Sequence, residues 1–168
     1  MSLIVLNATF QARAGKKGTE MVINTKMMNE LYPENRITFR NQYIYSLAGA
    51  GFLDSAYSQA EQLGQWCANH EYSDRYYWGA LGSIELAKHE YSKASAYFDK
   101  AANPDRDFMF FYLAGIAYFS DGQYIKAINL LERITRECPL LSANGIWAIK
   151  AYYYLARTYE EAGRLCDA

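Results

Sequence analysis

The sequence is poor in residues that build metal sites and disulfide frameworks. It has only two histidines among 168 residues, and its three cysteines are scattered at positions 67, 138 and 166. Cys67 and His70 lie one helical turn apart, but a structural zinc site needs four ligands and no second pair is nearby. Disulfide-stabilised secreted proteins usually carry an even number of cysteines. We therefore expect buried, reduced thiols, a cytoplasmic location, and no bound metal or cofactor.

Clustered positive charge and long apolar runs are absent as well. The formal net charge is −1, whereas nucleic-acid-binding proteins carry clustered lysine and arginine. No stretch approaches the roughly 18 uninterrupted apolar residues of a membrane span. The sequence therefore predicts neither a nucleic-acid nor a membrane partner.

Sequence patterns typical of catalysis are missing too. There is no Gly-x-Ser-x-Gly, no nucleotide-binding glycine pattern and no metalloprotease helix. Gly15-Lys-Lys-Gly18 lacks the spacing of a phosphate-binding loop and is typical of a turn between helices. Glu160 and Glu161 are adjacent, so on a helix they point in different directions. We expect a protein that is not an enzyme.

The stretch from Phe108 to Pro139 shows what the chain does contain. Two apolar patterns with helical periodicity flank the polar turn Ser120-Asp-Gly-Gln123. Gly122 suits a helix C-terminus, and Pro139 is a stop signal for the second helix. This pattern predicts a helical hairpin whose apolar faces need neighbouring elements to cover them.

The second half of this hairpin recurs along the chain. Gly122-Gln-Tyr-x-x-Ala127 has counterparts at Gly51–Ala56, His89–Ala94 and Gly163–Ala168. The intervals between the alanines are 38 (94 minus 56), 33 (127 minus 94) and 41 (168 minus 127) residues. Self-similarity near a period of about 34 residues, with two helices per unit, is the mark of tetratricopeptide repeats.

On these residues, from about Ile37 to Ala168, the chain resembles the tetratricopeptide repeat (TPR) family. The family's small residue of the first helix falls on Gly82, Gly115 and Ala156, and its large residue four positions earlier falls on Trp78, Phe111 and Tyr152. Arg40 departs from this pattern, because the family usually has a large apolar residue there. The resemblance implies an all-α, right-handed α-solenoid of helix-turn-helix repeats in one domain, residues 1–168. The repeats would be a degenerate unit at about 1–35, units at 36–74, 75–107 and 108–141, and a partial unit at 142–168.

Three local expectations follow in the third unit. His89 replaces the turn glycine, a position expected to need positive φ, which histidine tolerates better than most residues. Glu85 takes a packed aromatic position and needs solvent or a partner, and Lys88 lies three residues on. Ser73 or Asp74 is placed to cap the following helix.

A solenoid's functional surface is its concave groove, which the first helices of successive units line. The positions that the resemblance assigns to it are Tyr45, Tyr76, Ser83, Leu86, Met109, Tyr112, Ile116, Phe119, Tyr153 and Arg157, together with Gly79 and Lys150. The fourth unit thus offers an apolar, aromatic groove. The Lys, Asn and Arg set with which some TPR domains bind chaperone tails is absent from the middle units, so that ligand is not expected.

The resemblance implies a protein–protein interaction scaffold that binds a protein or peptide segment in this groove. Three alternatives stay open: a regulatory or sensor segment of a larger enzyme or transcription regulator, a self-associating structural module, and a small-ligand or metal receptor that uses the aromatic concave face. The last repeat opens a second helix at Gly163 and stops, without the polar capping helix usual in repeat arrays. We expect either a fragment of a longer array or an end covered by a partner chain, including a second copy in a homo-oligomer.

Overall fold

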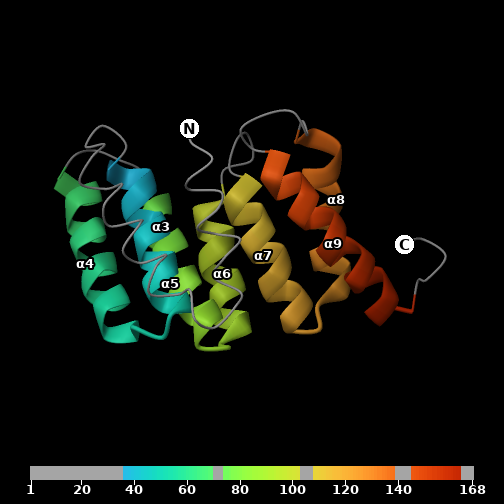
Figure 1. Ribbon diagram of the computed structural model, residues 1–168, viewed down its shortest axis with the longest axis horizontal. Coiled ribbons are helices and arrows are strands. Elements are labelled where there is room, and N and C mark those ends of the chain that lie inside the picture. Colours follow the sequence, from blue (N-terminus) through green and yellow to red (C-terminus); the bar gives the residue numbers. More distant parts are fainter. Residues whose placement is uncertain (1–35, 70–73, 103–107, 139–144, 164–168) are drawn as a thin grey trace. The chain divides into compact units, whose positions relative to one another are not determined.

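A computed structural model describes residues 36–69, 74–102, 108–138 and 145–163. These residues form seven helices and no strand (Figure 1), which confirms the predicted all-α class. The helices are α3 (Arg36–Gly49), α4 (Leu53–Asn69), α5 (Arg75–Ala87), α6 (Tyr91–Ala101), α7 (Phe108–Ser120), α8 (Tyr124–Glu137) and α9 (Gly145–Glu161). The chain divides between His89 and Glu90 into two compact units, and each is described here by itself.

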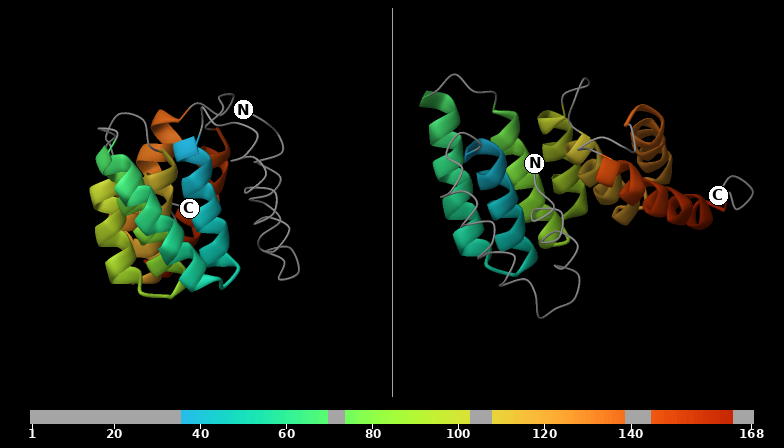
Figure 2. Two further views of the ribbon diagram at one scale, coloured as in Figure 1. Left: turned by 90° about the vertical axis from the view of Figure 1, so that its left-hand side faces the viewer. Right: turned by 45° about the horizontal axis from the view of Figure 1, so that its top comes forward.

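The first unit contains a hairpin of α3 and α4, with α5 packed against both helices. Both views of Figure 2 show α3 lying alongside α4. Ile44, Leu63 and Ile84, one from each helix, are fully buried where the three helices meet. Polar groups also lie inside this unit: the Asn41 side chain is 1 % exposed, and its Nδ2 donates a hydrogen bond to the Tyr76 carbonyl (2.6 Å). This bond joins α3 to α5, the first helices of two predicted repeats.

The second unit contains α6 to α9, in which α7 packs against α6, α8 and α9, and α8 packs against α9. Helix α7 has eight buried residues, from Phe110 to Tyr118 with only Ile116 half-buried among them. A helix that is apolar on nearly every side suits a position between other helices. Phe98, Leu131 and Ile134 complete the core from α6 and α8.

The turn that defines the repeat has the same geometry each time. Gly51, Gly122 and Gly163 have φ of 85°, 74° and 74°, and His89 has φ of 63°. Each of the four donates its backbone N–H to the carbonyl three residues earlier, at 3.0–3.1 Å. The expected positive φ at His89 is therefore confirmed, and the recurring sequence pattern corresponds to one recurring backbone turn.

One local prediction is wrong, and others lie outside the described residues. Asp74 precedes α5, but its side chain makes no capping hydrogen bond. Its backbone is already helical (φ −57°, ψ −8°), whereas a capping residue needs an extended conformation to aim its oxygen at the helix N–H groups. Ser73, His70, Pro139 and the first predicted repeat (1–35) lie outside the described residues. The division into repeats stays a prediction, and the boundary at His89 falls inside the predicted unit 75–107.

Three further observations concern the cysteines, potential metal ligands and membrane crossing. Cys67 and Cys138 are both buried, as predicted. In the parts of the chain that the structure describes, no group of three potential metal ligands gathers. None of the described helices combines the length and the apolar character that a membrane crossing requires.

Candidate interaction surface on the first helices

The first helices of the second unit, α7 and α9, meet through aromatic side chains. The Tyr112 ring lies 5.6 Å from the Trp147 ring and 5.8 Å from the Tyr154 ring, centroid to centroid. Two turns further along α7, the Phe119 ring lies 6.0 Å from the same Tyr154 ring, in a T-shaped arrangement. Edge-on pairs at such distances attract through the ring quadrupoles, so Tyr154 binds α9 to two turns of α7.

Two cations lie over this aromatic layer. The Lys150 ammonium is 4.8 Å from the Trp147 ring centre, and the Arg157 guanidinium is 5.2 Å from that of Phe119. No carboxylate pairs with Arg157 within the described ranges, and its side chain is exposed. Lys150, Tyr153, Tyr154 and Arg157 are spaced i, i+3, i+4 and i+7, so they lie on one face of α9.

Tyr153 supplies an exposed aromatic group on the same helix face. Its side chain is 54 % exposed, and its ring lies 5.3 Å from that of Tyr154. We call the surface formed by Met109, Ile116, Phe119, Lys150, Tyr153 and Arg157 the α7–α9 face. It presents a tyrosine and an arginine, two of the residue types in which binding hot spots are enriched.

In the first unit the predicted groove residues lie on α3 and α5. Tyr45, Tyr76 and Leu86 are half-buried. The Arg75 guanidinium lies 4.6 Å from the Tyr76 ring centre and donates to the Tyr76 hydroxyl (2.7 Å). Buried Ser83 donates its hydroxyl to the Gly79 carbonyl (2.9 Å), one turn earlier in the same helix.

Three predicted groove residues are buried rather than on an open surface: Gly79, Ser83 and Tyr112. Tyr112 is 3 % exposed because Trp147 and Tyr154 cover its ring, and Ser83 is 2 % exposed. In this structure Tyr112 supports the α7–α9 face from beneath. Whether any of the predicted groove residues binds a partner stays a prediction.

Trp147 and Tyr154 belong to this surface but are not among the predicted positions. A signal for both was present, because they continue the spacing of Lys150 and Arg157: positions 147, 150, 154 and 157 share one face of a helix. The family positions do not include these two rings, although the rings support the α7–α9 face.

A hydrogen bond between tyrosine and carboxylate joins each second helix to the next first helix within a unit. In the second unit Tyr118 donates to the Asp99 carboxylate, and Tyr159 donates to that of Glu132. Burial and the neighbouring Asp99 carboxylate raise the pKa of Tyr118 to about 12. These bonds hold α7 to α6 and α9 to α8.

In the first unit the roles are exchanged. Glu85 of α5 accepts from the Tyr57 hydroxyl of α4 (2.6 Å) and from the Lys88 ammonium (3.1 Å). The predicted pairing of Glu85 with Lys88 is thus confirmed, and Tyr57 is a second partner. Burial raises the pKa of Tyr57, while hydrogen bonds with Tyr57 and Glu85 raise that of Lys88.

With this geometry in place, comparison with known proteins identifies the fold. The chain is similar to a crystal structure of a putative kinesin light chain with nearly identical TPR-like repeats from Podosopora anserina. The two share 15 % sequence identity at a TM-score of 0.56, over 97 % of this chain and 86 % of that one. No protein-family model matches the sequence, and no curated protein matches it. The chain has the fold of TPR-like helical repeats, as the sequence predicts.

Proposed function

We propose that this protein is an interaction scaffold whose α7–α9 face binds a segment of a partner protein that carries apolar or aromatic side chains and carboxylates. The observation that carries the proposal is the stripe of residues on α9. Exposed Tyr153 lies between Lys150 and Arg157, and these two cations lie over the Tyr112 and Phe119 rings of α7. Helical-repeat folds in general present extended binding surfaces. A cytoplasmic location stays a prediction from the sequence.

The chemistry of the face favours such a segment. Tyrosine, tryptophan and arginine dominate interface hot spots, and the two aromatic residues bury much area at a small entropic cost. The rings that support Tyr153 and Arg157 are held by contacts between α7 and α9, so little ordering is needed on binding. Carboxylates on the partner would pair with Arg157, which has no acidic partner among the described residues.

A peptide selection tests the proposal. The immobilised protein is panned against a random peptide library displayed on phage, and the affinity of an enriched peptide is measured by fluorescence anisotropy. We expect enriched sequences that combine aromatic and acidic residues. Tyr153→Ala together with Arg157→Gln should weaken binding by about tenfold or more, as expected at hot spots.

The control for this test is Ile125→Ala. Ile125 is 78 % exposed on α8 and lies outside the α7–α9 face, so its removal should leave peptide affinity unchanged. Equal binding by the wild type and the double variant, with far-UV helicity intact, would rule out this surface.

Self-association is the second candidate function, because another side of α9 is also apolar and exposed. Ile149 is 56 % and Tyr152 is 51 % exposed, and they are three residues apart. Sedimentation of the same preparations distinguishes the two functions. A dimer that Tyr152→Ala dissociates, with no peptide enriched in the selection, would favour self-association.

A further inference from the structure

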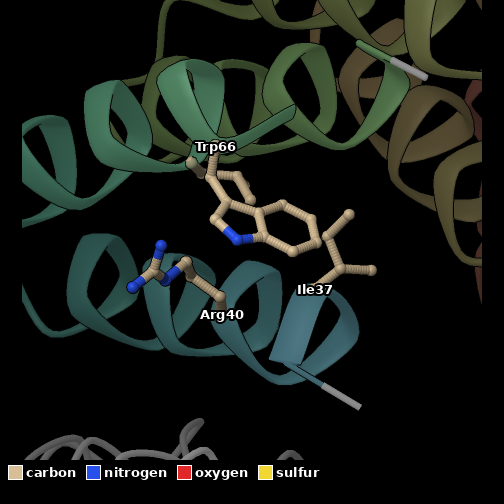
Figure 3. Close-up of a pocket in the computed structure, with 4 residues that line it drawn as sticks. Ile37, Arg40 and Trp66 are labelled. Carbon is tan, nitrogen blue, oxygen red and sulfur yellow. The ribbon is translucent and has the colours of Figure 1, made fainter. Parts of the chain in front are cut away.

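A small hollow lies between α3 and α4 in the first unit, far along the chain from the α7–α9 face. Its walls are Ile37 and Arg40 of α3 and Leu63 and Trp66 of α4. Figure 3 shows the Trp66 indole reaching from α4 toward α3, with Ile37 on one side and Arg40 on the other. The volume is about 40 Å³, which is room for a few heavy atoms.

The repeat pattern accounts for the hollow. At the position of Arg40, the later first helices carry large aromatic residues: Trp78, Phe111 and Tyr152. Phe111 is 6 % exposed and packs in its own unit. In α3 a narrower arginine side chain takes this position, so space remains beside Leu63 and Trp66.

Arg40 also brings a charge to an apolar position. Its side chain is half-buried, and within the described ranges it forms no hydrogen bond or ion pair. Leu63 is fully buried, and Ile37 and Trp66 are half-buried. The site therefore combines the Arg40 guanidinium, which has no anionic partner among the described residues, with a wall of aliphatic and indole carbon atoms.

We propose that this hollow binds a carboxylate carried on a short apolar group. The planar guanidinium matches a carboxylate through two parallel hydrogen bonds, which an ammonium cannot do. The aliphatic part of the ligand would lie against Trp66, Leu63 and Ile37, where burial of apolar area is favourable. The small volume admits only the carboxylate and one or two carbons, so the ligand would be a short aliphatic acid or the terminal residue of a peptide whose remaining atoms extend out of the hollow. This site is separate from the α7–α9 face and does not depend on the proposed function.

Nuclear magnetic resonance of the full chain tests this proposal. The probe is isovalerate, a five-carbon acid, and the readout is the indole N–H resonance of Trp66, assigned by its loss in Trp66→Phe. We expect a saturable shift with isovalerate and none with its neutral amide. Arg40→Leu should weaken binding by about tenfold or more, because the charge-assisted hydrogen bonds are lost. Arg40→Lys should retain part of the affinity.

Two ligand sources share this chemistry, and a second titration separates them. A short peptide that ends in leucine is compared with the same peptide amidated at its C-terminus. Tighter binding of the free peptide than of isovalerate identifies a chain terminus, and the reverse order identifies a small acid. The control variant is Arg136→Leu, whose arginine side chain is 69 % exposed on α8. An unmoved Trp66 resonance, equal shifts with acid and amide, or equal binding by folded Arg40→Leu would each overturn the proposal.

Discussion

The two units use the same kind of hydrogen bond in opposite directions. Late in α7 and α9 of the second unit, Tyr118 and Tyr159 donate to carboxylates on the preceding second helix. At the equivalent place in α5 of the first unit stands Glu85, which accepts from Tyr57 on α4. Both units therefore have a tyrosine–carboxylate hydrogen bond between neighbouring helices at this place. They differ in which of the two helices carries the carboxylate.

The position of the carboxylate determines whether the group that is buried, and loses its hydration, is charged or neutral. In the second unit the buried group is the neutral phenol of Tyr118, and Asp99 is exposed. In the first unit the carboxylate itself is buried, because Glu85 is 7 % exposed. A buried charge is costly unless a counter-charge and hydrogen bonds compensate it. Lys88 and Tyr57 provide both, so the first unit depends more strongly on its polar cluster.

The largest expected effect comes from removing Glu85. Glu85→Ala leaves the Tyr57 hydroxyl and the Lys88 ammonium without their shared acceptor, and should lower the free energy of unfolding by about 1–3 kcal/mol. Glu85→Gln keeps an acceptor for Tyr57 and should cost less. Urea denaturation followed by circular dichroism measures both.

The control for this prediction is Glu90→Ala. Glu90 pairs with Lys93 at 3.3 Å, but both side chains are about half exposed or more (49 % and 64 %), so the loss should stay below about 0.5 kcal/mol. Equal losses in Glu85→Ala and Glu90→Ala would contradict the importance assigned to the buried cluster.

The second prediction concerns the buried phenol of the second unit. Tyr118→Phe removes the hydrogen bond to Asp99 and should cost about 1 kcal/mol below pH 10. Above pH 10 the unfolded tyrosine loses its proton, whereas folded Tyr118 keeps its own until about pH 12. The wild-type advantage is therefore fully present below pH 10 and is lost as the pH rises toward 12.

Unfolding below pH 10 and at about pH 11 tests this sign, with Tyr152→Phe as the control because that ring is 51 % exposed. The difference in stability between wild type and Tyr118→Phe should shrink at the higher pH, and the difference for Tyr152→Phe should change less. A wild-type advantage over Tyr118→Phe that grows at alkaline pH would refute the burial argument.

These contacts show which parts of the molecule could be predicted from sequence. The turn geometry at His89 and the bond between Glu85 and Lys88 were predictable, because both depend on residues within one turn of helix. The bond from Tyr57 to Glu85 spans 28 residues and depends on how α4 and α5 align. Periodicity gives the face of each helix but not this alignment.

The candidate surface follows the same rule. The predicted positions on α9 came from the family resemblance, and the structure shows that Tyr153 is exposed there. The burial of Tyr112 was not readable, since it depends on two rings of another helix. The hollow beside Arg40 was predictable only in part. The family pattern marks Arg40 as unusual, but only the packing of Trp66 shows that space remains.

The smallest expected effect compares two glycines, one in each unit. A Cβ on Gly115 would lie 3.0 Å from Cδ2 of Leu131, which is fully buried, and a Cβ on Gly64 would lie 3.0 Å from Cδ2 of the Tyr77 ring. Alanine gains up to about 1 kcal/mol over glycine inside a helix, and overpacking opposes this gain. Tyr77 is half-buried and can turn aside, whereas the packed Leu131 cannot move without disturbing its neighbours.

Gly64→Ala should therefore be neutral or stabilise the protein by up to about 0.5 kcal/mol, and Gly115→Ala should destabilise it by about 0.5–1 kcal/mol. Parallel thermal melts of the two variants measure this difference, and each variant serves as the control for the other because both make the same chemical change inside a helix. If Gly115→Ala melts at or above the temperature of Gly64→Ala, then Leu131 can yield, and the interior of the second unit is less tightly packed than its burial implies.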